Sequence, residues 1–239
     1  MFFQKKLKKP YVAAIVPAAG TASRMNGLDK QFEELSGTPV LVHTMQALSY
    51  SDWIDELVLV TRQESIPLVL ELIRAYAVPK VRSVVAGGST RQQSVANGLN
   101  AISPQTAYIA IHDGARPLVG QQVIADAVLN ALRYGAAAAA VPIIDTIKIA
   151  DGERMITQTP DRSHLYAVQT PQVFRLEQYQ EAAKQATASN QDYTDDCQML
   201  EAIGQKVYLS MGDYANLKIT TPVDLSIAQA LLAYAEEQR

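Results

Sequence analysis

Short apolar runs alternate with segments of helical periodicity through the first half of the chain, and this alternation limits the possible folds more than any other feature. The runs are rich in β-branched residues and end near polar or turn-forming residues, as buried strands do. They are Val12–Val16, Leu57–Val60, Val81–Val85, Tyr108–Ile111 and Ala137–Val141. Apolar residues recur at helical spacing in Val40–Leu48, Pro67–Ala77, Gln92–Ile102 and Gln121–Leu132. Strands that alternate with helices form a mostly parallel sheet covered on both faces, so the sequence predicts an α/β fold.

The pattern changes after Pro142. Residues 143–162 are polar and irregular, with short alternating pieces, and they predict an extended hairpin that leaves the main body. Helices are expected again at Leu176–Gln185 and Asp195–Ile203, and short strands at Gln205–Leu209 and Leu217–Ile219. Thr221 and Pro222 have the sequence of a helix start, with threonine as the cap and proline in the first turn.

The composition of the 239 residues is that of a globular protein, with 48% hydrophobic and 19% charged residues. A net charge of −3 gives no general field for polyanions, so we expect no nucleic-acid partner. No apolar run approaches the roughly 18 residues of a membrane span or has the form of a secretory signal, so we expect no membrane contact. The one cysteine, Cys197, excludes an intrachain disulfide and favours a cytoplasmic location.

Loops at the carboxyl ends of parallel strands build the sites of such folds. The first strand is followed by the small residues Ala18, Ala19 and Gly20, and its loop also carries Arg24 and Lys30. Small residues let backbone N–H groups approach an anion, and two cations suit a triphosphate. The loop matches neither the P-loop nor the spaced glycines of dinucleotide sites, so an ordinary strand-to-helix turn with solvated cations stays open.

The third strand ends in Gly87 and Gly88, and Ser94 follows in the first turn of the next predicted helix. Two glycines permit close backbone approach, and the serine hydroxyl suits a base or a ribose. A simple glycine turn with a capped helix is the alternative.

The fourth strand ends in His112-Asp113-Gly114-Ala115-Arg116-Pro117. A carboxylate at the end of a central strand suits Mg²⁺, which binds one or two carboxylates together with substrate phosphates. We expect Arg116 to hold Asp113 in place, and a purely structural pair of these two residues is the alternative. We interpret His112 as a packed, hydrogen-bonded histidine rather than as a base.

A lysine, Lys218, stands in the late apolar stretch Leu217–Ile219. A buried lysine without a partner is costly, so we expect an anionic partner for it, either a side chain or a ligand phosphate.

Taken in order, these pieces resemble the 2-C-methyl-D-erythritol 4-phosphate cytidylyltransferase family of the non-mevalonate isoprenoid pathway. The resemblance covers roughly residues 13–230. Its most specific pieces are Pro17–Gly20, His112–Pro117, Asp161–Ser163, Gln169–Phe174, Thr194–Asp196 and Asn216–Pro222.

The resemblance implies a Rossmann-like nucleotidyltransferase fold, as a single domain over residues 1–239 with a protruding β-arm at 143–164. It implies transfer of CMP from CTP to 2-C-methyl-D-erythritol 4-phosphate with release of pyrophosphate, Mg²⁺ or another divalent cation as cofactor, and a homodimer whose arms reach into each other's sites. The roles that it implies are cytidine binding by Ala18, Ala19, Gly20, Gly88 and Ser94, catalysis at the triphosphate by Arg24, Lys30 and Lys218, ribose and metal binding by Asp113, and binding of the polyol phosphate by Thr146, Arg162 and Arg116.

Two positions depart from the family pattern. Ala22 stands where the family usually has glycine, and Asp29 stands where it usually has proline. Asp29 puts a like charge near the expected triphosphate.

Three other functions compete with this interpretation. A ribitol-5-phosphate cytidylyltransferase would share the fold, CTP and metal, but we expect Leu-Ala-Gly-Gly in its first loop and valine in place of Ala115. A non-catalytic nucleotide-binding protein would lose the cations that this chain keeps. A dinucleotide-dependent oxidoreductase is disfavoured because the spaced glycines are missing after the first strand.

Overall fold

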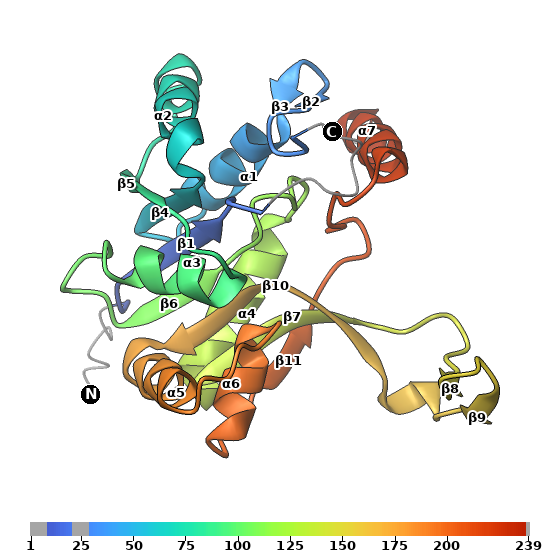
Figure 1. Cartoon of the computed structure of the whole chain (residues 1–239). Helices are drawn as coiled ribbons and strands as arrows, with labels where there is room; N and C mark the ends of the chain where they lie inside the picture. The colour runs from blue at the N-terminus through green and yellow to red at the C-terminus, as the bar shows by residue number, and fades with distance from the viewer. Residues whose placement is uncertain (1–8, 21–28, 238–239) are drawn as a thin grey trace, which may run out of the picture.

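A central sheet organises the molecule, which we describe from a computed structural model for residues 9–20 and 29–237. Among these residues the sheet has seven strands in the order β11-β7-β10-β6-β1-β4-β5 (Figure 1). The strands are β1 (Val12–Pro17), β4 (Glu56–Thr61), β5 (Val81–Ala86), β6 (Tyr108–Ile111), β7 (Ala136–Pro142), β10 (Tyr166–Arg175) and β11 (Tyr208–Met211). Among these seven strands only β10 runs antiparallel to its neighbours. The mostly parallel α/β sheet that the sequence predicts is therefore confirmed.

Helices cover both faces of this sheet. On one face α1 (Val40–Ser49), α2 (Ile66–Ala75) and α4 (Gln121–Tyr134) pack against one set of alternating strand residues, which includes Val12 and Ala14. On the other face α3 (Arg91–Leu99), α5 (Leu176–Ala188) and α6 (Asp196–Ala202) pack against the opposite set, which includes Ile15 and Val58. Both sets are apolar because neither face meets water, and this is why the strands read as continuous apolar runs.

The last helix, α7 (Pro222–Glu237), begins at the predicted proline and packs beside the short hairpin of β2 (Glu34–Leu35) and β3 (Thr38–Pro39). The Asp224 carboxylate accepts hydrogen bonds from the backbone N–H groups of Thr220 and Thr221, which satisfies donors at the helix start. No helix in the described part of the chain has the length and apolar character needed to cross a membrane.

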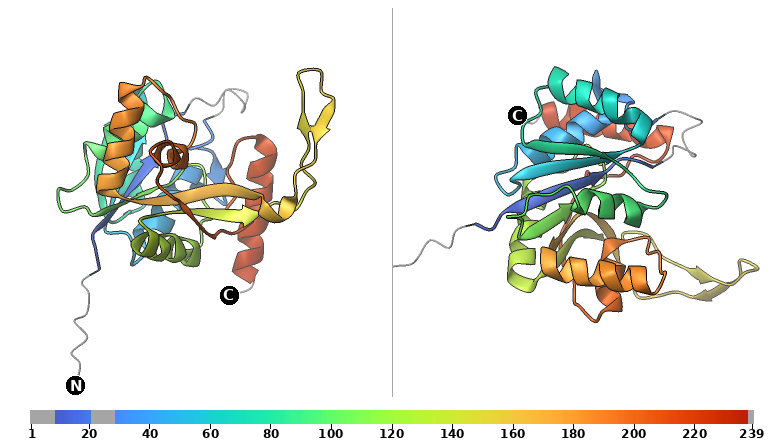
Figure 2. Two further views of the ribbon diagram at one scale, coloured as in Figure 1. Left: turned by 90° about the horizontal axis from the view of Figure 1, so that it is seen from below. Right: turned by 60° about the vertical axis from the view of Figure 1, so that its left-hand side comes forward.

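An arm leaves the main body between β7 and β10. It carries the short antiparallel strands β8 (Ile149–Ala150) and β9 (Ile156–Gln158), followed by a 3₁₀ turn at Arg162–His164. The hairpin projects away from the sheet in every view (Figures 1 and 2). The protruding β-arm that the sequence predicts is therefore confirmed.

Two details of the sheet differ from the sequence prediction. Strand β10 was not predicted, because Pro171 and the buried polar residues Gln169 and Gln172 interrupt its apolar pattern, and its pairing with β7 shifts register between Val168 and Gln172. The predicted strand Leu217–Ile219 is wrong. This segment crosses the carboxyl edge of the sheet without joining it, and the Ile219 N–H donates to the carbonyl of Ala115.

Candidate functional site

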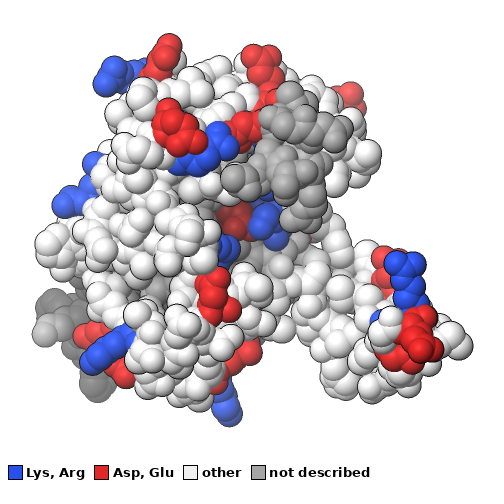
Figure 3. Space-filling model, in the orientation of Figure 1, with Lys and Arg blue, Asp and Glu red and all other residues white. Residues whose placement is uncertain are grey.

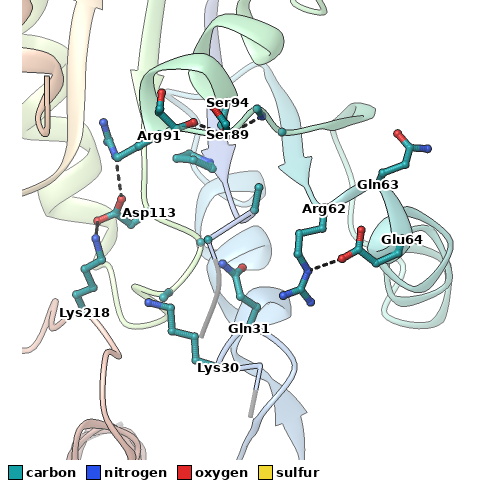
Figure 4. A pocket seen from close by; sticks show the side chains of 18 residues that line it. Lys30, Gln31, Arg62, Gln63, Glu64, Ser89, Arg91, Ser94, Asp113 and Lys218 are labelled. Atoms are coloured by element: carbon teal, nitrogen blue, oxygen red, sulfur yellow. Dashed lines mark hydrogen bonds and ion pairs between the residues drawn. The ribbon is translucent and has the colours of Figure 1, made fainter. Parts of the chain in front are cut away.

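A cleft of about 560 Å³ opens at the carboxyl edge of the sheet (Figure 4). In the space-filling view, acidic and basic side chains lie inside a hollow in the middle of this face (Figure 3). The loops after β1, β4, β5 and β6 line the cleft, and the segment before α7 completes it. The sequence-predicted residues among its lining are Ala19, Gly20, Lys30, Gly88, Ser94, Asp113 and Lys218. The fold therefore brings together loops that are separated by up to two hundred residues.

The Asp113 carboxylate is the electrostatic centre of the cleft. Lys218 Nζ lies 3.0 Å from Asp113 Oδ2, Arg116 Nε lies 3.4 Å from the same oxygen, and Arg91 Nε lies 3.8 Å from Oδ1. Burial alone would raise the pKa of Asp113, but Lys218, Arg91 and Arg116 outweigh it and hold the pKa well below its usual range. The carboxylate is therefore ionised at neutral pH. The predicted contact between Arg116 and Asp113 is confirmed, and the anionic partner expected for Lys218 is the Asp113 side chain.

A chain of neutral hydrogen bonds fixes the loop that carries Asp113. The Asp113 N–H donates to Thr170 Oγ1 (3.0 Å), Thr170 Oγ1 lies 3.1 Å from His112 Nδ1, and His112 Nε2 lies 3.2 Å from the Arg116 carbonyl oxygen. A carbonyl oxygen only accepts, so Nε2 carries the hydrogen and Nδ1 accepts from the threonine hydroxyl. Burial lowers the pKa of His112 to about 4. The histidine is a packed structural residue, as the sequence predicts.

Sequence reasoning missed Arg91, which begins α3. Its guanidinium lies between Asp113 and the fully buried carboxylate of Asp196, with which it forms a close ion pair. The hydroxyl of Tyr179 donates to the other Asp196 oxygen over 2.6 Å. Burial would lower the pKa of Arg91, but the two carboxylates raise it above its usual value, so it stays charged. Arg91 follows the Gly87-Gly88 turn, and Asp196 ends the segment Thr194–Asp196, but nothing in the sequence connects these two segments.

Hydrogen bonds between its own residues and the start of α3 hold the glycine turn after β5. The Gly88 N–H donates to Ser94 Oγ (3.1 Å), and that hydroxyl donates to the Thr90 carbonyl (2.9 Å). A Cβ atom at Gly87 would lie 2.4 Å from the Cβ of Ala19, so a side chain there would push the two loops apart. Since the hydroxyl hydrogen is already used, Ser94 meets a ligand as an acceptor. Likewise, the Ala18 N–H already donates a hydrogen bond to the Val60 carbonyl oxygen (2.6 Å).

The turn of Asp29, Lys30 and Gln31 forms another wall of the cleft. Lys30 and Gln31 line it, and Asp29 makes a close ion pair with Arg62, which follows β4. The expected neighbours Ala22 and Arg24 lie outside the described residues.

A smaller recess of about 280 Å³ adjoins the cleft on the other side of Asp113. The two recesses share Arg91, Asp113 and Lys218, and the smaller one adds Arg116 and Thr170. Asp113 and its cations therefore form the boundary between two spaces, a geometry in which two anionic molecules can meet at one set of positive charges.

Thr146 and Arg162 lie on the arm rather than in the cleft. Both are exposed, and Arg162 Nη1 donates to the Ile144 carbonyl of the same arm (2.7 Å). Neither belongs to the described residues that line the two recesses, so a single chain does not bring them to Asp113.

A divalent cation would find the Asp113 carboxylate at the boundary between the two recesses. The described residues contain no group of three or more acidic, histidine or cysteine side chains placed to hold a metal ion. Asp113 is ionised and faces the cleft, which fits the donor set of Mg²⁺ that is bound by one carboxylate together with substrate phosphates.

Comparisons with known proteins agree on one family. A sequence model of 2-C-methyl-D-erythritol 4-phosphate cytidylyltransferase matches residues 12–234. The protein of that name from Caldanaerobacter subterraneus subsp. tengcongensis is 42% identical over 223 residues, which cover 92% of this chain and 98% of the relative. The one from Desulforamulus reducens is 44% identical, with 92% and 95% covered.

Solved structures give the same result. The 4-diphosphocytidyl-2C-methyl-D-erythritol synthase of Anaerococcus prevotii superposes with a TM-score of 0.84 at 33% identity, covering 94% of this chain and 97% of that one. The 2-C-methyl-D-erythritol 4-phosphate cytidylyltransferase of Thermus thermophilus gives a TM-score of 0.76 at 31% identity, with 92% and 98% covered.

The burial of neutral His112 predicts a loss of stability in mild acid. Its pKa is 6.5 when unperturbed and about 4 in the folded protein. As the pH falls from 6.5 towards 4, the His112 side chain is protonated in the unfolded chain but stays neutral in the folded one. The free energy of unfolding therefore decreases. The expected loss from this group between pH 7 and pH 5 is about 2 kcal/mol. Urea unfolding at both pH values should show a smaller decrease for His112→Gln than for the unmodified protein. Equal decreases would contradict this assignment.

Proposed function

The chain belongs to the 2-C-methyl-D-erythritol 4-phosphate cytidylyltransferase family, and we propose that the cleft around Asp113 performs this reaction. CMP passes from CTP to 2-C-methyl-D-erythritol 4-phosphate, giving 4-diphosphocytidyl-2-C-methyl-D-erythritol and pyrophosphate. The observation that carries the proposal is the position of Asp113 with Lys218, Arg91 and Arg116, between two adjoining recesses. The larger recess takes the nucleotide, and the smaller one takes the polyol phosphate. The family match does not favour the ribitol phosphate alternative.

The nucleotide is held mainly by main-chain atoms and small side chains. We assign the cytidine to Ala19, Gly20, Gly88 and Ser94, which line the larger recess, and to Ala18, which precedes Ala19 in the chain and is itself buried. The N–H groups of Ala18 and Gly88 are already used within the protein, so neither donates to the ligand, and Ser94 offers an acceptor. A hydroxyl acceptor suits the exocyclic amino group that distinguishes cytosine from uracil.

Charge neutralisation is the main task of the site. A phosphate oxygen of the polyol phosphate attacks the α-phosphorus of CTP, the new P–O bond forms, and the bond to pyrophosphate breaks. The attacking oxygen is already ionised at neutral pH, so no general base is required, and this agrees with a buried, neutral His112. Lys30 and Lys218 lower the repulsion between the two anions and stabilise the crowded phosphorus. Arg24, which lies outside the described residues, is assigned the same role from the sequence.

Asp113 and Arg116 position the reactants. Asp113 fixes Lys218 at the boundary between the recesses, and Arg116 lines the recess for the polyol phosphate. Asp113 is also the residue that would hold Mg²⁺, which when bound supplies further positive charge to the phosphates.

The arm completes the site of a second subunit. Thr146 and Arg162 lie on the arm of this chain, outside its own recesses, and the arm exposes Ile144, Met155 and Ile156 with about 65% of their surface accessible. Exposed apolar side chains at such density are typical of a protein–protein contact. We therefore propose a homodimer in which each arm brings Thr146 and Arg162 to the polyol phosphate bound by the partner. A cytoplasmic location is proposed as well, since Cys197 is a free thiol.

The proposed reaction is tested by pyrophosphate release from CTP with each polyol phosphate. We expect release with 2-C-methyl-D-erythritol 4-phosphate and Mg²⁺, much slower release with ribitol 5-phosphate, and none after the metal is removed with EDTA. Faster release with ribitol 5-phosphate would overturn the substrate assignment, and activity that survives EDTA would overturn the role of the metal.

Removal of either lysine should slow the chemical step. Lys30→Ala and Lys218→Ala should each lower kcat by about 10²-fold, the typical effect of losing one group that stabilises transition-state charge. Lys184→Ala, at an exposed position of α5, removes the same charge outside the cleft and serves as the control. Unchanged turnover in both cleft variants would refute their roles.

The role of the arm is tested by complementation between two inactive variants in a mixed dimer. Arg162→Ala and Lys218→Ala should each impair the homodimer. A mixed dimer holds one site with both an intact Lys218 and an intact partner Arg162, so co-expression of the two variants with different tags should restore activity. Mixed dimers that form but stay as inactive as the parents would show that the arm acts in its own subunit or not at all.

A further inference from the structure

The turn that presents Lys30 to the cleft also carries an acidic side chain. Asp29 stands directly before Lys30, so an uncompensated carboxylate there would repel the triphosphate that Lys30 attracts. Asp29 cannot swing freely into solvent, because its Oδ1 accepts the Gln31 N–H (3.3 Å) and its carbonyl accepts the Phe32 N–H (2.8 Å). The carboxylate is thus a fixed part of the cleft wall.

Arg62 meets this carboxylate from the neighbouring strand. It follows β4, lines the cleft, and reaches toward the turn of Lys30 and Gln31 (Figure 4). Its Nη2 makes a close ion pair with Asp29 Oδ2 and lies 3.3 Å from Ser65 Oγ, and its Nε lies 3.1 Å from Glu64 Oε1. The Asp29 and Arg62 side chains are 21% and 29% exposed, so salt screens their charges only in part.

We propose that Arg62 is a positioning residue for CTP that acts through Asp29. It offsets the negative charge of Asp29 beside Lys30 and anchors the turn, so that the Asp29 carboxylate repels the phosphates less than it would without Arg62. Its Nη2 is already engaged by Asp29 and Ser65, and its Nε lies beside the Glu64 carboxylate, which would itself repel a phosphate bound there. This inference rests on the proposed function, because it requires CTP in the larger recess.

A double-mutant cycle separates this role from direct phosphate binding. The proteins are the unmodified chain, Arg62→Ala, Asp29→Asn, and the double variant, each as the full chain. The dissociation constant of CTP is measured by calorimetry with Mg²⁺ and without the polyol phosphate. We expect Arg62→Ala to weaken CTP binding about tenfold, Asp29→Asn to have little effect, and the double variant to bind within about threefold of the unmodified protein. Higher ionic strength should shrink the defect of Arg62→Ala.

Controls distinguish charge, fold and chemistry. Arg74→Ala removes an equal charge from an exposed position on α2 and should leave CTP binding unchanged. Arg62→Lys keeps the charge and should retain most of the affinity. Thermal unfolding in each case identifies a variant that fails to fold. In steady-state assays, Arg62→Ala should raise the KM for CTP far more than it lowers kcat.

Two results would overturn the inference. A double variant that binds CTP as weakly as Arg62→Ala would mean that Arg62 contacts the phosphates directly, and normal binding by Arg62→Ala would mean that Asp29 needs no compensation. A different result would refute the proposed reaction alone. If the unmodified protein binds CTP but releases no pyrophosphate with either polyol phosphate, the reaction is wrong, whereas the CTP dissociation constants of the double-mutant cycle can still be compared. An unmodified protein that does not bind CTP would refute both.

Discussion

The contact of the Asp113 carboxylate with Lys218, Arg116 and Arg91 is the interaction on which the site depends. The three cations come from three different segments, and without a common anion they would repel one another at close range. Asp113 holds them together and remains ionised because they surround it. The arrangement keeps a net positive charge at the boundary of two recesses, which is where a reaction between two phosphates has to overcome repulsion.

Buried polar groups behind the cleft keep these charges in place. On one side Thr170 and His112 fix the main chain of the Asp113 loop through neutral hydrogen bonds. On the other side Asp196, held by Tyr179, anchors Arg91. Breaking a buried pair of this kind leaves an uncompensated charge and costs about 3–5 kcal/mol. The cleft is therefore organised before a ligand arrives, so little reorganisation is required during the reaction.

Local patterns account for most of the fold and much of the site. The apolar runs predicted β1, β4, β5, β6 and β7 with small errors at their ends, because a strand buried on both faces leaves a clear signal. Strand β10 left no such signal, since Pro171 and buried glutamines stand within it. Residues 217–219 were wrongly predicted as a strand. Their apolar side chains, Leu217 and Ile219, pack against α7, and the Ile219 N–H pairs with the Ala115 carbonyl rather than with a strand of the sheet.

The sequence by itself determined the mostly parallel α/β class of the sheet, the loops at its carboxyl edge, and the small and charged residues that these loops carry, including Lys30, Asp113 and Lys218. Only the tertiary structure decided which charges meet. Arg91 and Asp196 stand 105 positions apart, and Arg62 and Asp29 stand 33 apart, so no local spacing connects them. Secondary structure follows from neighbours along the chain, whereas ion pairs follow from distances in space that are set once the strands have taken their order in the sheet.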